Sequence, residues 1–254
     1  MNQAAQANRP TIALVHGAFA ESASWNGVIS ALQERGYGTI AIANPLRDLQ
    51  EDAAYVRSVL ESLPGPVVVA GHSYGGSVMS EAAEGLANVQ ALVFVASFIL
   101  EAGESTGELA NKFPGNQLGS ALAPRPFPLS NGGTGTDLYI QTDKFHDIFA
   151  ADVAADNATL MAATQRPIAA VALEGKASHA AWKTIPSWSL VTLQDLAVPA
   201  EAQRFMAERA GATAVEIDAS HAVTVSRPAE VADLIDTAAQ AATGSSTPAE
   251  AVTA

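Results

Sequence analysis

A serine within a short glycine-rich segment has the setting of a catalytic nucleophile. Residues 71–76 read Gly-His-Ser-Tyr-Gly-Gly and place Ser73 in a G-x-S-x-G pattern. In such a turn the serine backbone is strained and the facing residues must be small, so Gly71 and Gly75 let a strand and a helix approach closely. The hydroxyl then stands clear of the sheet. The pattern therefore predicts that Ser73 is a nucleophile.

The residues on either side of this pattern support the prediction. The three fixed positions alone would occur by chance in roughly one chain in ten of this length. Here an apolar β-branched run at residues 67–70 precedes the pattern, and the helix-compatible residues 77–83 follow it. A strand, a turn and a helix in this order are the context that the motif requires.

A serine that keeps its proton is a poor nucleophile, so Ser73 needs an adjacent base, and the base needs a third group that holds its tautomer. His221 is the best candidate, because it lies in the loop that leaves the last predicted strand, residues 212–217. That loop is at the same edge of the sheet as Ser73. The alternative interpretation of His221 is a solvated loop histidine.

The other histidines have different predicted roles. We expect His16 and His72 to brace the turns next to them. His146 and His179 lie in a long insertion, where exposed and substrate-adjacent positions are equally open. None of the five histidines has the spacing of a metal-ligand set, so no metal is predicted.

The acid that orients the base is expected after the strand that follows the insertion. Asp195 has that place, directly after the apolar residues 188–193. Asp218 is a rival because it lies three residues before His221, but we expect it to shape the turn there. Glu201 falls on the next predicted helix and is a weaker candidate. The predicted acid is therefore Asp195.

A tetrahedral oxyanion needs two backbone N–H donors aimed at it. One donor normally comes from the residue after the nucleophile, which is Tyr74 here. The other comes from the loop after the first strand, where residues 16–19 read His-Gly-Ala-Phe and Ala18 has the matching place. The alternative interpretation of residues 16–19 is a tight βα turn. The serine pattern favours the oxyanion role.

Aromatic side chains near these segments are candidates for the substrate pocket. We predict that Phe19, Phe98 and Trp182 line it, and Phe98 is the best placed of the three because it follows a predicted strand. Phe149 is a further candidate. Trp25 is expected to pack a helix against the sheet instead.

The elements that must position these residues alternate between strands and helices. Apolar runs predict six buried parallel strands, at residues 11–15, 39–43, 67–70, 91–96, 188–193 and 212–217. Apolar residues at helical spacing predict helices at residues 25–35, 49–63, 77–83, 199–210 and 228–242, with Ser24 and Ser226 as N-cap candidates. Helices must cover such a sheet on both faces, and its ligand site lies outside the carboxyl ends of the strands. The predicted fold is α/β, a doubly wound parallel sheet of about six strands.

Residues 97–186 interrupt this alternation. The stretch is rich in glycine and proline, notably at residues 124–135, while residues 143–163 and 166–173 are compatible with helices. An interruption this long inside a compact domain is usually functional, such as a lid over a site. We therefore predict one domain over residues 10–242 that carries a helical cap insertion at about residues 97–186.

Composition limits the function classes that are open to the chain. Its 254 residues, 48% of them hydrophobic, are enough for one sizeable core. A net charge of −13 repels phosphates, so we expect neither nucleic acid nor an anionic membrane as a partner, and a small neutral substrate fits better. The absence of cysteine excludes disulfides, thiolate metal sites and a cysteine nucleophile.

Both ends of the chain differ from the part between them. Residues 1–9 lack the basic start and the longer apolar region of a signal peptide, and residues 243–254 have the composition of a disordered tail. We predict that both ends are flexible. No apolar run approaches the roughly 20 residues that cross a bilayer. We expect a soluble, cytoplasmic protein, with a removed leader and the oligomeric state left open.

Taken together, these segments resemble the α/β-hydrolase family over residues 11–242. The matching pieces are residues 16–19, residues 71–76 and residues 220–223, the last followed by Pro228. More narrowly, the sequence is similar to short-cap bacterial hydrolases related to plant methylesterases and hydroxynitrile lyases, which share the H-G-A loop and the G-H-S-x-G-G turn. The family has the chain order serine, acid, histidine that is found here.

The resemblance implies a cofactor-free serine esterase with Ser73 as nucleophile, His221 as base and Asp195 as acid. It also implies Ala18 and Tyr74 as oxyanion donors. The chain has no room for the two leading strands of the full eight-stranded fold, so a reduced sheet is expected. Residues 194–196 read Gln-Asp-Leu, where relatives often carry a more polar stretch.

The leading hypothesis is hydrolysis of small carboxylic esters through an acyl-enzyme. A second hypothesis is lyase or other non-ester chemistry on the same three residues, because one fold hosts several chemistries. A third is a ligand-binding protein with little turnover. A nucleotide site is not expected, because the chain has neither a G-x-G-x-x-G nor a G-x-x-x-x-G-K-[ST] pattern.

Overall fold

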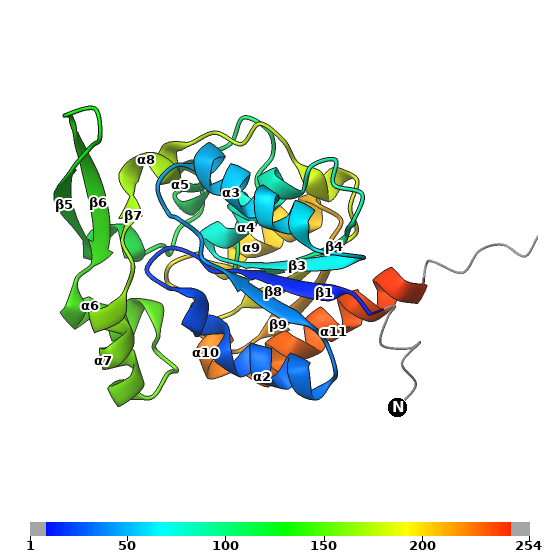
Figure 1. Ribbon diagram of the computed structural model, residues 1–254. Helices are drawn as coiled ribbons and strands as arrows, with labels where there is room; N and C mark the ends of the chain where they lie inside the picture. Colours follow the sequence, from blue (N-terminus) through cyan, green and yellow to red (C-terminus); the bar gives the residue numbers. More distant parts are fainter. Residues whose placement is uncertain (1–8, 245–254) are drawn as a thin grey trace, which may run out of the picture.

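The computed structural model describes residues 9–244 (Figure 1). The ends that were predicted to be flexible fall outside this range, except for residues 9, 243 and 244. Residues 243 and 244 belong to the last helix, which begins at Pro228. No helix among the described residues is long and apolar enough to cross a membrane.

Six parallel strands form the central sheet, in the order β2-β1-β3-β4-β8-β9. Their bounds are β1 Thr11–Val15, β2 Thr39–Ile42, β3 Val67–His72, β4 Val89–Val95, β8 Ser187–Thr192 and β9 Thr213–Ile217. Each predicted strand is confirmed to within two residues at either end. The sequence order of the strands reverses at β1 and β3, as in a doubly wound sheet.

Both faces of the sheet are buried, and β3 shows how its residues divide between them. Val67 and Val69 belong to one apolar cluster, while Val68 and Ala70 belong to the other. Successive side chains of a strand point to opposite faces, so an uninterrupted apolar run supplies both clusters.

Helices cover the two faces. The first cluster includes residues of α3 (Leu49–Ser62), α4 (Tyr74–Ala83) and α9 (Ala200–Arg209). The second includes residues of α2 (Asn26–Glu34) and α11 (Pro228–Gly244). Two short elements complete this part of the chain, the 3-10 turn η1 (Ser22–Trp25) and α10 (Val223–Ser226). The sheet and these helices are called the body below.

The start of α2 differs from the prediction. Ser24 lies inside η1, where its Oγ donates to the carbonyl oxygen of Glu21 at 2.7 Å, so it is not an N-cap. Trp25 is fully buried in the second cluster and packs this segment against the sheet, as expected.

Residues 97–186, called the insertion below, contain more β structure than their sequence indicated. Its helices and turns are α5 (Thr106–Ala110), η2 (Leu118–Ala121), α6 (Thr142–Phe149), α7 (Ala155–Thr164), α8 (Ala170–Glu174) and η3 (Ala181–Lys183). A three-stranded antiparallel sheet accompanies them, formed by β5 (Leu122–Pro128), β6 (Thr134–Ile140) and β7 (Ile168–Ala169). The glycine- and proline-rich residues 124–135 are therefore largely a β-hairpin.

The outer part of the insertion lies beyond the carboxyl ends of the central strands. Figure 1 shows β5, β6, α6 and α7 in green on that side of the body, with α3 and α4 above the sheet and α2 and α11 below it. The ligand sites of open α/β sheets lie at this edge.

Candidate active site

Ser73 occupies a strained turn between β3 and α4. Its φ and ψ angles are 54° and −126°, a conformation that a non-glycine residue adopts only when its surroundings hold it there. The surroundings are tight, because a Cβ atom on Gly75 would lie 2.3 Å from the carbonyl oxygen of Val15. A Cβ on Gly71 would lie 2.7 Å from the carbonyl oxygen of Gly75. The two glycines thus permit the close approach that the sequence predicted.

The backbone of the turn is fixed by hydrogen bonds. The carbonyl oxygen of Ser73 accepts a bond from Oγ of Ser97 at 2.7 Å and one from the N–H of Gly76 at 3.0 Å. The N–H of Ser73 donates to the carbonyl oxygen of Val95 at 3.2 Å. The side-chain hydroxyl takes part in none of these bonds and faces a cavity.

This cavity, called the inner cavity below, has a volume of about 60 Å³ and mainly apolar walls. One wall belongs to the body and contains Ala18, Phe19, Ser73, Tyr74 and His221. The facing wall includes residues of the insertion, among them Phe98, Thr106, Leu118, Phe149 and Leu173. The predicted nucleophile and the predicted base thus open onto one cavity, between the body and the insertion.

His221 and Asp195 are in direct contact. Nδ1 of His221 lies 2.7 Å from Oδ2 of Asp195, and both residues are buried. Because an ionised carboxylate only accepts hydrogen bonds, Nδ1 carries the proton. Nε2 of His221 then keeps its lone pair, which is the form that a general base requires.

Asp195 is held by more groups than the sequence analysis identified. Its Oδ1 accepts from the backbone N–H groups of Ala197 at 2.8 Å and Val198 at 2.7 Å. Its Oδ2 also accepts from Oγ1 of Thr192 at 2.9 Å and Nε2 of Gln203 at 3.0 Å. Gln203 was missed from the sequence alone, although it is a polar residue at a position that falls on the buried, apolar side of α9.

The loop that carries His221 has two further supports. Nε2 of His72 lies 2.8 Å from the carbonyl oxygen of His221 and donates to it, since a carbonyl only accepts. The N–H of Ala222 donates to the carbonyl oxygen of Phe149 at 2.9 Å. Burial lowers the pKa of His72 to about 3, so its ring stays neutral. His72 is thus a brace for the loop of the predicted base.

His16 braces the other loop of the site. Its Nδ1 donates to the carbonyl oxygen of Gly17 at 2.9 Å, and its Nε2 accepts from the N–H of Asn44 at 3.1 Å. Burial lowers its pKa to about 4, so the neutral ring makes both bonds. The loop so held includes Ala18, whose N–H donates to no group in residues 9–244. That N–H group remains available to a ligand.

Tyr74 is fixed through its side chain. The phenol donates to Oδ2 of Asp52 at 2.9 Å, and both groups are buried. Burial raises the pKa of Tyr74 and also that of Asp52, so the phenol keeps the proton that it donates. Tyr74 is the first residue of α4, and its backbone N–H has no partner within the described chain. Both predicted oxyanion donors therefore have a free N–H group in a rigid backbone.

Two of the three predicted pocket aromatics line the inner cavity and one does not. Phe19 and Phe98 are in its walls, and so is Phe149. Trp182 is absent from the lining: its Nε1 donates to the carbonyl oxygen of Leu100 at 2.7 Å, which holds the ring elsewhere. The prediction for Trp182 is corrected accordingly.

The remaining candidates lie away from the cavity. Asp218 and Glu201 are exposed. Nε2 of His146 bonds with the carbonyl oxygen of Val153 at 2.9 Å, and Nδ1 of His179 lies 3.0 Å from Oε1 of Glu81. Among residues 9–244, no group of three or more histidine, aspartate or glutamate side chains is arranged to hold a metal ion.

Comparison with known proteins identifies the protein family of this chain. The model of the alpha/beta hydrolase family matches residues 12–234, so the chain belongs to this family, as its motifs predicted. A curated relative, the alpha/beta hydrolase nvfD of Aspergillus novofumigatus, is 28% identical over an aligned length of 256 residues, and the alignment covers 91% of this chain and 97% of that protein. Family membership supports a hydrolase.

Solved structures share the fold at low sequence identity. Polyneuridine aldehyde esterase has a TM-score of 0.78 and 18% identity, over 90% of this chain and 98% of that one. A pyrethroid hydrolase from Sphingobium faniae has a TM-score of 0.72 and 21% identity, over 91% and 98%. A methylesterase from Arabidopsis has a TM-score of 0.75 and 16% identity, over 91% and 99%. At these identities the likeness concerns the fold.

Proposed function

We propose that this protein hydrolyses small carboxylic esters through an acyl-enzyme on Ser73. The observation that carries the proposal is one arrangement: a strained serine and a buried histidine open onto the same cavity, and the histidine is paired with an aspartate at 2.7 Å. A serine hydrolase of the Ser-His-Asp type uses these three groups as nucleophile, base and orienting acid. The esterase names of several structural neighbours agree with this reaction class.

The first half of the reaction forms the acyl-enzyme. Nε2 of His221 removes the proton of Ser73 as Oγ attacks the ester carbonyl carbon. The negative charge that develops on the carbonyl oxygen is stabilised by the N–H groups of Ala18 and Tyr74, which need no rearrangement because hydrogen bonds already hold the backbone around both residues. His221 then gives its proton to the leaving alkoxide, and the C–O bond breaks.

The second half returns the enzyme to its starting state. His221 removes a proton from water, the resulting hydroxide attacks the acyl carbon, and the proton passes to Oγ of Ser73 as the acid leaves. Asp195 stays ionised throughout and stabilises the imidazolium that forms twice in the cycle. Side chains, backbone N–H groups and water supply every group that these steps use.

The inner cavity favours small, uncharged acyl groups. Its volume of about 60 Å³ leaves little room beside Ser73, and its walls are mainly apolar. A charged acyl group would lose its hydration there without finding a partner. We propose that the insertion acts as the cap that closes this cavity, and that the protein works in the cytoplasm on small molecules.

Covalent labelling tests the proposal directly. An alkyl fluorophosphonate should modify the protein once, at Ser73, and p-nitrophenyl acetate should give a burst of p-nitrophenol equal to the enzyme concentration. Absence of both the label and the burst in folded protein would sink the proposal. Product analysis addresses the lyase alternative, because a lyase yields a carbonyl compound and no carboxylate.

A further inference from the structure

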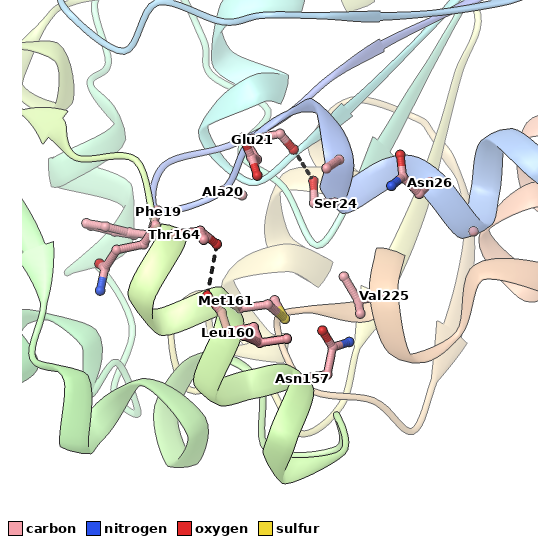
Figure 2. Close-up of a pocket in the computed structure, with 13 residues that line it drawn as sticks. Phe19, Ala20, Glu21, Ser24, Asn26, Asn157, Leu160, Met161, Thr164 and Val225 are labelled. Carbon is pink, nitrogen blue, oxygen red and sulfur yellow. Dashed lines mark hydrogen bonds between the residues drawn. The ribbon is translucent and has the colours of Figure 1, made fainter.

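A second and larger pocket lies outside the inner cavity. This outer pocket has a volume of about 350 Å³ and lies between α7 and the segment from residue 19 to residue 27. Figure 2 shows Leu160 and Met161 on α7, Glu21 and Ser24 on the opposite side, and Val225 nearby. It is open to solvent and is lined by both apolar and polar side chains. None of the proposed catalytic residues lines it.

Among the described residues, Phe19 is the one that lines both the inner cavity and the outer pocket. Its neighbour Ala18 faces the inner cavity, and its other neighbour Ala20 faces the outer pocket. Figure 2 places Phe19 at one end of the outer pocket. The residues at 18–20 therefore form a thin partition between the two spaces.

The partition is held under strain. Phe19 has a φ of +60°, in the left-handed region that side chains avoid, and it is 3% exposed. Its N–H donates to the carbonyl oxygen of Arg166 at 3.0 Å, and its ring packs edge-on against Phe149 at 6.3 Å between centroids. Backbone strain of this kind persists where the surrounding structure imposes it, and it often marks a functional site.

The position of His221 indicates which half of an ester lies on which side of the partition. In the proposed reaction the leaving oxygen must lie beside Nε2 of His221, which protonates it. Val225 lines the outer pocket and follows His221 by four residues, on α10. Thr106 of α5 and Leu173 of α8 line the inner cavity but not the outer pocket, whose insertion residues lie within 157–165, mainly on α7. The alcohol half of an ester thus points past Phe19 toward the outer pocket, and the acyl half points toward α5 and α8.

We propose that the outer pocket is a subsite for the alcohol half of the substrate, and that Phe19 controls the passage to it from Ser73. This inference rests on the proposed esterase function. The subsite suits a bulky, uncharged alcohol: Leu160, Met161 and Val225 offer apolar surface, and Asn157 offers an amide for a hydrogen bond. Glu21 disfavours an anionic group. With Phe19 in place, the wild-type protein prefers esters of small alcohols.

Two esters of one acid test this proposal, methyl butyrate and 1-naphthyl butyrate. Phe19→Ala should raise the ratio of kcat/KM for the naphthyl ester over that for the methyl ester about tenfold or more, the size of effect that pocket shape gives. Comparing the ratio between variants cancels the different leaving abilities of the two alcohols. An unchanged ratio in folded protein would overturn the proposal.

Matched variants distinguish the effect of removing the Phe19 partition from the effect of simply enlarging the inner cavity. Phe19→Gly removes the same ring and relieves the strain of a positive φ, so it serves if Phe19→Ala does not fold. Phe98→Ala enlarges the inner cavity without touching the outer pocket. Adding Ala23→Trp, at an exposed residue of the outer pocket, should cancel the gain in Phe19→Ala and leave any gain in Phe98→Ala. Equal cancellation in both, or in neither, contradicts the assignment.

A binding measurement distinguishes failure of this inference from failure of the esterase proposal. In a Ser73→Ala background, fluorescence titration with intact 1-naphthyl butyrate, which must pass Phe19 to span both spaces, should show about tenfold tighter binding in Phe19→Ala. Adding Ala23→Trp should reverse the gain. If the binding behaves in this way while the wild type takes no phosphonate label and hydrolyses no ester, the esterase proposal fails and the pocket stands. If esters are hydrolysed but neither Phe19 variant changes the selectivity or the binding of 1-naphthyl butyrate, only the pocket assignment fails.

Discussion

Strands β3 and β5 lie in opposite environments. Every residue of β3 is buried, and the strand is hydrogen-bonded to β1 on one side and to β4 on the other. Strand β5 is an edge strand that pairs with β6, and each of its residues is exposed or half-buried. The first strand leads directly into Ser73, whereas the second belongs to the insertion.

This difference separates the chemistry of the protein from its selectivity. A substitution in β3 disturbs two neighbouring strands and the turn of the nucleophile, so that region tolerates little change. A substitution in β5 meets few partners. We therefore expect changes in β3 and its turn to alter turnover, and changes in the insertion, or in body residues that contact it such as Phe19 and Arg47, to alter the choice of ester.

The largest effect should come from the body, at the nucleophile. Ser73→Ala should lower kcat by several orders of magnitude, since comparable nucleophiles elsewhere lose roughly a million-fold. The fold should persist, because alanine carries the same Cβ through the strained turn. Steady-state kinetics with p-nitrophenyl acetate, together with circular dichroism, will check both parts. Unchanged turnover would remove Ser73 from the mechanism.

Asp195→Asn should have the next largest effect. An amide in place of the carboxylate favours the wrong tautomer of His221, and a loss of roughly 10⁴-fold in kcat is expected. Asp218→Asn is the matched control, because Asp218 is exposed and should change kcat little. Equal losses in the two variants would contradict the assignment of the acid.

Arg47→Ala should alter selectivity more than turnover. Arg47 belongs to the body and binds the insertion: Nη1 lies 2.7 Å from Oδ1 of Asp137, and Nη2 donates to the carbonyl oxygen of Pro167 at 2.9 Å. Losing these bonds should cost about 1–2 kcal/mol of unfolding free energy, toward the low end because Arg47 is partly exposed. Denaturant unfolding and the ratio of kcat/KM for p-nitrophenyl butyrate over the acetate are the measurements.

Arg57→Ala is the control for that variant. Arg57 donates to the carbonyl oxygens of Ala82 at 3.1 Å and Glu84 at 2.7 Å, which are both in the body. It should lose stability while keeping the ester preference of the wild type. If Arg47→Ala and Arg57→Ala change the preference between butyrate and acetate esters equally, the insertion does not have the separate role in selectivity that we assign to it.

The smallest effect concerns His179, which ties the insertion to α4. The hydrogen bond with Glu81 raises the pKa of His179 above its ordinary value of 6.5. A raised pKa means that the ion pair stabilises the fold below about pH 6.5 and that this contribution is lost as pH rises through the folded pKa. The Tm of the wild type relative to His179→Gln should therefore fall between pH 6 and pH 9. A constant difference would show that the pair is not ionised.

The body could be predicted because its sequence signals are local. A short uninterrupted apolar run must be buried on both sides, which is the environment of a central parallel strand. Residues 67–70 and the other apolar runs therefore identified the strands of the central sheet. Asp195 could be placed by its position after β8, and the structure sets it 2.7 Å from His221. Its catalytic role remains a prediction.

The insertion could not be predicted in the same way. Strand β5 contains prolines at 124, 126 and 128, which usually argue against a strand. Alternate residues direct their N–H groups to the same side, so the three prolines leave only the outer edge without donors, while residues 123, 125 and 127 face β6. Trp182 was misplaced for a related reason, because its partner is the Leu100 carbonyl, 82 residues away in the sequence.

The neutral, buried His72 has a consequence for the pH dependence of the reaction. Its ring lies 4.7 Å from that of His221, yet its pKa of about 3 keeps it uncharged at any pH where the protein would work. The His72 ring therefore carries no positive charge that would repel a proton on the ring of His221. His72 should therefore add no ionisation of its own to the pH dependence of kcat/KM in that range, although it lies next to the proposed base.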